Sequence, residues 1–241
     1  MLNGLDLFSG IGGMSLALRE WVKPVVYCEI DPYCQAILLN RMADGSVRKA
    51  PIWDDIRTLS RDEIRDLIDI IYGGFPCQDI SIAGRGKGLD GERSGLYWET
   101  YRLAKEIKPT FIFLENVPGI ISKGCCEVAD SLAEIGYDCR WDVFSAEKYV
   151  DQKRDRWFLL AKLSSLRRNE RACEGVQSIR ETSFHEEFSN YKLSSMECWG
   201  SFARSVRKDN GVLSRVDRIR ALGNAVVPQQ AKEAFKILMG L

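Results

Sequence analysis

Cys77 is the residue that could most clearly take part in a reaction. It stands in the sequence GGFPCQ of residues 73–78. It directly follows an apolar run typical of a buried strand, and a loop rich in glycine and charge extends from 81 to 95. The ordinary role of a free cysteine is that of a small buried hydrophobe. Against that role, this cysteine is expected at a sheet edge where ligands bind, beside a loop able to close as a lid.

A glycine turn forms the second group of interest. The sequence SGIGG of residues 9–13 follows an apolar run and precedes an apolar-rich helix start, so its backbone N–H groups can approach a ligand closely. Ser15 replaces the third glycine of a dinucleotide fingerprint, and no Lys-Ser/Thr pair follows to grip a triphosphate. Glu29 ends a second apolar run and suits a ribose diol. These features favour an adenosine-containing ligand that has no phosphate group requiring a dedicated binding motif.

The histidine and cysteine content excludes several chemistries. His185 is the single histidine of the chain, whereas Ser-His and Cys-His nucleophiles need a positioned imidazole and most catalytic zinc sites use several. The eight cysteines include no Cys-x-x-Cys pair. We therefore expect reduced thiols and no metal.

Length and composition predict one catalytic domain with a small insertion. The chain has 241 residues, of which 45% are hydrophobic and 28% charged, as in soluble globular proteins. No apolar run approaches the length of a membrane span, and residues 1–6 lack the pattern of a signal peptide. We expect a cytoplasmic protein with no membrane partner.

The charge is unevenly distributed. The formal net charge is zero, which argues mildly against a nucleic-acid partner if the charges are spread evenly. Residues 147–171, however, carry eight basic and four acidic side chains. By composition alone, a nucleic-acid-binding surface and a solvated face explain this stretch equally well.

The elements expected to position these residues alternate between strands and helices through about residue 145. Continuous apolar runs, of the kind that a parallel sheet buries on both faces, predict a doubly wound α/β sheet with ligands beyond the carboxyl ends of its strands. Glu29, Cys77 and Glu115 all fall at such ends. From 164 to about 213 the composition becomes polar and aperiodic, which indicates a separate small module. The expected strands cover 2–8, 25–29, 69–74 and 110–115, and the expected helices include 32–42 and 228–239.

Five segments together resemble the DNA cytosine-5 methyltransferase family. They are DLFSG (6–10), GFPCQ (74–78), ENV (115–117), QKRDR (152–156) and GNAVVP (223–228), and they occur in the family's order and approximate spacing. The resemblance implies the Rossmann-like sheet of S-adenosylmethionine-dependent methyltransferases. It also implies a catalytic domain made of residues 1–161 plus 215–241. It leaves 162–214 as a target-recognition region, which is short for this family and suggests a short or degenerate target sequence.

In the family, the first block and the acid after the second strand hold S-adenosylmethionine. By resemblance, Phe8 stacks on the adenine, 9–13 bind the amino-acid end, Glu29 takes the ribose, and 55–56 lie at the adenine edge. The expected cofactor contacts are Phe8, Ser9, Gly10, Ile11, Gly12, Gly13, Glu29, Ile30, Asp55, Ile56, Pro76, Leu96, Asn224 and Ala225.

The resemblance also implies a mechanism on a cytosine flipped out of double-stranded DNA. Cys77 adds as thiolate to C6 of the base, Glu115 holds N3 and the exocyclic amine, and Arg156 with Arg154 holds O2 and orients Glu115. The loop 78–94 would act as a clamp. Its basic residues are Arg85, Lys87 and Arg93.

Three other functions share parts of this pattern. A branch of the same family modifies tRNA, but it tends to have a proline in place of Phe75. A catalytically silent nucleic-acid-binding relative has no need to keep Cys77, Glu115, Arg154 and Arg156 together. A zinc deaminase needs His-x-Glu and Pro-Cys-x-x-Cys, which this chain lacks. We expect a monomer acting on DNA in a bacterial cell or phage-infected host, with a restriction endonuclease as a possible partner.

Overall fold

The computed structural model describes residues 1–64, 68–76, 95–151, 153–164 and 225–241. Cys77, Asn224, the 78–94 loop and most of the expected target-recognition region lie outside these residues. Within the described residues, no helix is long and apolar enough to cross a membrane.

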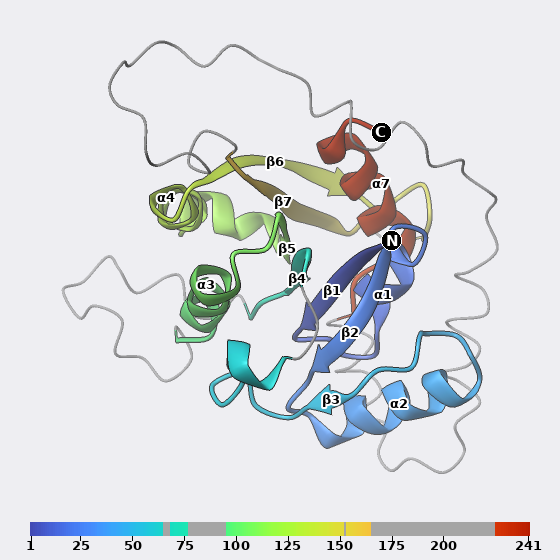
Figure 1. Ribbon diagram of the computed structural model, residues 1–241. Helices are drawn as coiled ribbons and strands as arrows, with labels where there is room; N and C mark the ends of the chain where they lie inside the picture. Colours follow the sequence, from blue (N-terminus) through green and yellow to red (C-terminus); the bar gives the residue numbers. More distant parts are fainter. Residues whose placement is uncertain (65–67, 77–94, 152, 165–224) are drawn as a thin grey trace.

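A seven-stranded sheet in the order β3-β2-β1-β4-β5-β7-β6 forms the centre of the described structure (Figure 1). The first five strands in this order run parallel, β7 is antiparallel to β5, and β6 is antiparallel to β7. The strands are β1 Leu2–Leu7, β2 Val22–Cys28, β3 Ile52–Trp53, β4 Ile70–Gly74, β5 Phe111–Asn116, β6 Tyr137–Ser145 and β7 Asp155–Leu163.

Helices cover both faces of the sheet (Figure 1). Side chains of α3 and α4 pack with one face of the central strands, and those of α1 and α7 pack with the other. This arrangement confirms the expected doubly wound, Rossmann-like class. The helices are α1 Gly13–Leu18, α2 Pro32–Ala43, α3 Gly95–Ile107, α4 Cys125–Glu134 and α7 Pro228–Met239, with the short 3₁₀ turns η1 Arg61–Glu63 and η3 Pro118–Ser122.

The expected elements differ from the observed ones mainly at their ends. β2 begins at Val22, before the predicted start at 25, and Glu29 follows the strand instead of ending it. The helix predicted at 228–239 matches α7, which begins with Pro228 at its first position and stops at Gly240, whose φ of 77° is left-handed. The β6–β7 hairpin was not predicted. Most positions of β6 are exposed or partly exposed, and the buried apolar run 157–161 of β7 lies within a stretch that was interpreted by its charge.

A polar network is buried beneath the site, on the α1 face of the sheet. Asp6 on β1 is fully buried and accepts a hydrogen bond of 2.6 Å from the Ser15 hydroxyl on α1. That hydroxyl also lies 2.7 Å from the phenol oxygen of Tyr72 on β4. Burial raises the pKa of Asp6 to about 7, and the nearby charge of Glu29 adds to the shift. The carboxyl is therefore largely protonated below neutral pH.

Asp6→Asn should remove a pH-dependent cost to folding. In the unfolded chain this aspartate ionises near pH 3.8, but in the folded protein it keeps its proton to about pH 7. Between these values the folded state binds the extra proton, so this group lowers stability as pH rises and has no further effect above pH 7. Urea unfolding of ligand-free protein should be measured from pH 4 to 8. Over this range the free energy of unfolding of Asp6→Asn should rise relative to that of wild type by up to roughly 4 kcal/mol. A difference independent of pH would contradict the assignment.

Candidate active site

The residues predicted to do chemistry meet at one edge of the sheet. Parallel register places Leu7 at the end of β1 beside Cys28 of β2 and Gly73 of β4, and it places Gly74 beside Glu115 of β5. The carboxyl ends of these strands therefore lie side by side. In an open α/β sheet, this is where ligands bind.

The glycine turn after β1 depends on left-handed backbone conformations. Phe8, Gly10 and Gly12 have φ values of 52°, 54° and 83°. Ser9 fixes the turn to two strands, since its hydroxyl donates to the Asp6 carbonyl at 2.8 Å and its amide donates to the Cys28 carbonyl at 3.0 Å. The turn is thus held rigidly at the strand ends, with Phe8 half-buried against the main core.

Glu29 is oriented by backbone donors. Its carboxylate accepts from the Gly10 amide at 2.6 Å and from the Asp31 amide at 2.8 Å. Burial raises its pKa, while the two amides oppose that shift by stabilising the charged form. Each carboxylate oxygen keeps further accepting capacity, which is what a ribose diol requires. Ile30, the next residue, is exposed.

The turn after β3 carries the expected adenine-edge residues. The Glu29 amide donates to the Trp53 carbonyl at 2.9 Å, which places the start of this turn beside the acid. The Asp55 carboxylate accepts three hydrogen bonds from the Arg57 guanidinium, and these lower its pKa. Ile56 is buried in the main core, against which Trp53 also packs.

Apolar side chains contribute to the same region of the core. Phe8, Trp53 and Leu96, the second residue of α3, are partly buried side chains packed against the same core. Aromatic and aliphatic surface combined with a buried carboxylate suits an adenosine group. The residues present therefore fit the cofactor that the sequence analysis predicts.

The C-terminal segment returns to the glycine turn. A Cβ atom at Gly13 would lie 3.2 Å from the Val226 carbonyl oxygen, so only glycine allows this approach without displacement. The Arg154 guanidinium donates to the Ala225 carbonyl at 2.7 Å. Ala225 is thus placed between the turn and β7, while Asn224 lies outside the described residues.

Glu115 and Arg156 form an ion pair at the site. Arg156 Nε lies 2.8 Å from Glu115 Oε1, and the two side chains are only 15% and 12% exposed. Burial raises the pKa of Glu115, although the positive charges of Arg156 and Arg154 oppose the shift. A Cβ atom at Gly74 would lie 2.5 Å from Glu115 Oε2, so that glycine makes room for the carboxyl group.

Asn116 connects β5 to the segment that leads to the predicted nucleophile. Its side-chain amide donates to the Phe75 carbonyl at 3.1 Å, and its Oδ1 accepts from the Val117 amide at 2.8 Å. Phe75 is buried and Pro76 is exposed. Cys77, the next residue, lies outside the described residues.

The structure therefore brings together most of the predicted site residues and adds supporting ones. Asn116 stood within the ENV block, but its bond to Phe75 joins segments far apart in sequence and had no local signal. Arg41, a buried arginine on α2 that donates to the Ile11 carbonyl at 2.6 Å, was also missed. An arginine on a predicted helix is ordinarily solvated, so nothing in the sequence indicated this role.

Comparison with known proteins identifies the family. The family model described as C-5 cytosine-specific DNA methylase matches residues 2–210. The Type II methyltransferase M.CviJI of Paramecium bursaria Chlorella virus IL3A is 31% identical over 96% of this chain and 58% of its own length. M2.BsuMI of Bacillus subtilis is 34% identical over 66% of this chain and 41% of its own. The chain thus spans about half the length of these relatives.

A solved structure supports the same assignment. The crystal structure of a candidate DNA modification methyltransferase encoded within an E. coli prophage is 29% identical to this chain. It superposes with a TM-score of 0.57 over 69% of this chain and 48% of the other. The resemblance in the sequence blocks is confirmed, and the chain belongs to the C-5 cytosine-specific DNA methylase family.

Proposed function

We propose that the protein transfers a methyl group from S-adenosylmethionine to C5 of a cytosine in double-stranded DNA. The observation that carries this proposal is the largely shielded Glu115–Arg156 pair, which lies at the same sheet edge as the Glu29-bound glycine turn. One group is suited to a pyrimidine edge and the other to an adenosine. Family membership and the names of the relatives support DNA as the substrate.

The cofactor supplies an electrophilic methyl group carried on a sulfonium. In this chain, Phe8 would stack on the adenine and Glu29 would accept from the ribose hydroxyls. The rigid turn 9–13 would hold the amino-acid end. Because Gly13 packs on Val226, ordering of this turn also depends on the C-terminal segment.

Cys77 is proposed to activate the base. C5 of cytosine is a poor nucleophile, so the thiolate would first form a bond to C6, which shifts the C5–C6 π electrons toward C5. The electron-rich C5 then accepts the methyl group. Loss of the C5 proton and departure of the Cys77 thiolate restore the double bond.

Glu115 would control the charge on the ring during this attack. Its raised pKa favours the protonated carboxyl, which can donate to N3 while the other oxygen accepts from the exocyclic amine. Arg156 fixes the orientation of this carboxyl through its 2.8 Å contact. Arg154 adds positive charge beside the base and is itself held by the Ala225 carbonyl.

The domain division remains a proposal. Packing of α7 against the sheet supports a catalytic unit of residues 1–161 plus 215–241, since Phe235 contacts both Trp21 and Phe113 with ring centroids 5.4 and 5.2 Å apart. Residues 162–214 would then recognise the target, although β7 continues to Leu163. A monomeric state, a restriction endonuclease partner and a cytoplasmic location stay predictions.

Cys77→Ala should abolish methyl transfer. Without the thiolate the ring is not activated, so incorporation of labelled methyl into unmodified duplex DNA should fall by more than about 1,000-fold. Cys126→Ala, at an exposed cysteine on α4, is the matched control and should retain activity. Equal labelling by wild type and Cys77→Ala would disprove the nucleophile, and labelling of tRNA alone, assayed in parallel, would overturn the substrate.

Duplex DNA containing 5-fluorocytosine should trap the intermediate. Fluorine at C5 cannot leave as the proton does, so the Cys77–C6 bond should persist after methyl transfer. Denaturing electrophoresis and peptide mass spectrometry should find a stoichiometric adduct on the peptide that contains Cys77. Activity on normal DNA with no adduct on the fluorinated duplex would contradict the covalent mechanism.

Glu115→Gln should separate chemistry from cofactor binding. Glutamine keeps the shape but cannot supply a proton, so kcat should fall by about 100-fold or more while S-adenosylhomocysteine affinity stays unchanged. If the protonated carboxyl is the active form, wild-type kcat falls as pH rises through the Glu115 pKa, and the raised pKa moves this fall toward neutrality. In Glu115→Gln, kcat should not show this fall as pH rises. Glu134→Gln on α4 should retain it, and an unchanged kcat in Glu115→Gln would refute the role.

A further inference from the structure

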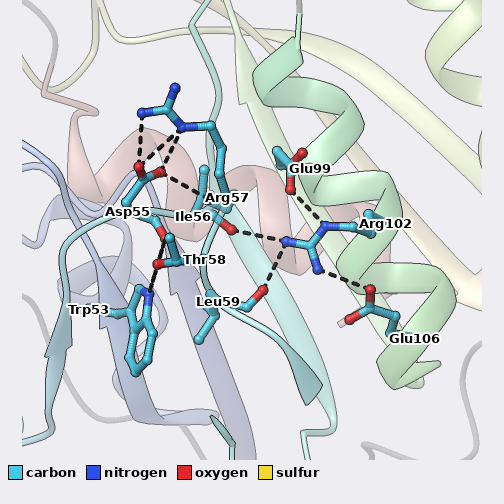
Figure 2. Close-up of polar contacts among 9 residues, drawn as sticks. All are labelled: Trp53, Asp55, Ile56, Arg57, Thr58, Leu59, Glu99, Arg102 and Glu106. Carbon is cyan, nitrogen blue, oxygen red and sulfur yellow. Dashed lines mark hydrogen bonds and ion pairs between the residues drawn. The ribbon is translucent and has the colours of Figure 1, made fainter. Parts of the chain in front are cut away.

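Arg102 on α3 makes an unusual set of contacts with the turn that follows β3 (Figure 2). Its Nη2 atom donates to the carbonyl oxygens of Ile56 and Leu59 at 3.0 and 2.8 Å. The remainder of the guanidinium pairs with two acids of its own helix, Glu99 at 2.7 Å and Glu106 at 3.0 Å. Four hydrogen bonds therefore fix one side chain between α3 and the turn.

The turn itself is tightly ordered from within. The Asp55 carbonyl accepts from the Trp53 indole at 3.0 Å and from the Thr58 hydroxyl at 2.9 Å (Figure 2). The Leu59 amide donates to the Ile56 carbonyl at 3.3 Å. Both carbonyl groups that Arg102 binds thus belong to this one turn, at its middle and at its end.

Arg102 consequently joins two walls of the expected adenine pocket. One wall is the turn with Asp55 and Ile56. The other is α3, which carries Leu96 near its start and packs on the same core. A lysine at this position has a point charge and a shorter reach, so it cannot reproduce the planar fork that binds two carbonyls and two carboxylates at once.

We propose that Arg102 is a positioning residue that sets the adenine-edge turn against α3 and thereby determines selectivity for the adenine of the cofactor. It acts through the turn and not by contact with the cofactor. The inference rests on the proposed function, because it takes 55–56 as the adenine-edge residues. Asp55 would discriminate by accepting from the exocyclic amine of adenine, which requires its backbone to be held in place.

The test compares Arg102→Lys with Lys232→Met in binding titrations. Lys232 forms an ion pair with Glu20 that joins α7 to the residues after α1. The side chains of this pair are 29% and 28% exposed, which is similar to the 32% and 25% of Arg102 and Glu99. The ligands are S-adenosylhomocysteine and S-inosylhomocysteine, in which oxygen replaces the exocyclic amine. Arg102→Lys should weaken the binding of S-adenosylhomocysteine by about tenfold, the size expected for losing one or two hydrogen bonds. It should also reduce the preference of the protein for S-adenosylhomocysteine over the inosine analogue. Lys232→Met should change neither.

Hydrogen exchange in ligand-free protein supplies a second readout. Arg102→Lys should speed exchange in the peptide covering 55–59 while leaving other sheet peptides unchanged. Glu106→Gln keeps both carbonyl bonds and should leave this peptide protected. Unchanged exchange, faster exchange throughout the protein, or an equal loss of affinity for both ligands would each overturn the positioning role. Failure of wild type to bind S-adenosylhomocysteine would instead overturn the proposed function.

Discussion

The site depends on the absence of side chains at the end of the central strand β4. A Cβ atom at Gly73 would lie 1.9 Å from the Leu7 carbonyl oxygen, and one at Gly74 would lie 2.5 Å from Glu115 Oε2. Any larger residue at Gly73 would force β1 and β4 apart and disturb the glycine turn that follows β1. At Gly74 it would displace the carboxyl that pairs with Arg156. Two adjacent glycines thus permit both halves of the site to form.

The same edge concentrates acids whose charge the surrounding core disfavours. Asp6, Glu29 and Glu115 all have raised pKa values, and burial is the leading cause in each. What opposes burial differs: a serine hydroxyl at Asp6, backbone amides at Glu29 and arginine charges at Glu115. Glu29 is therefore suited to accept hydrogen bonds, whereas Glu115 is suited to exchange a proton. One sheet edge can in this way bind a polar cofactor and perform acid chemistry.

The sequence predicted what local patterns encode. Apolar runs located β1, β2, β4 and β5, and the stretch 228–239 was predicted as the helix that forms α7. The β6–β7 hairpin was missed because β6 has no continuous apolar run and the apolar run 157–161 of β7 stands among charged residues. Arg154 and Arg156 illustrate the difficulty, since composition alone could not distinguish a solvated face from a pocket. Only the family resemblance indicated the pocket, and the structure then placed Arg156 beside Glu115. Arg102 had no local signal.

The C-terminal helix links the hairpin to the cofactor side of the site. Gln230 of α7 is fully buried, and its amide donates to the Phe144 carbonyl at 2.7 Å and to the Arg154 carbonyl at 2.8 Å. The Arg154 guanidinium in turn donates to the Ala225 carbonyl. The backbone and the side chain of Arg154 are therefore both held by the C-terminal segment. Its nearest contact there, Ala225, lies 71 residues later in the sequence. The position of Arg154 therefore depends on the C-terminal residues Ala225 and Gln230 as well as on the strand that it precedes.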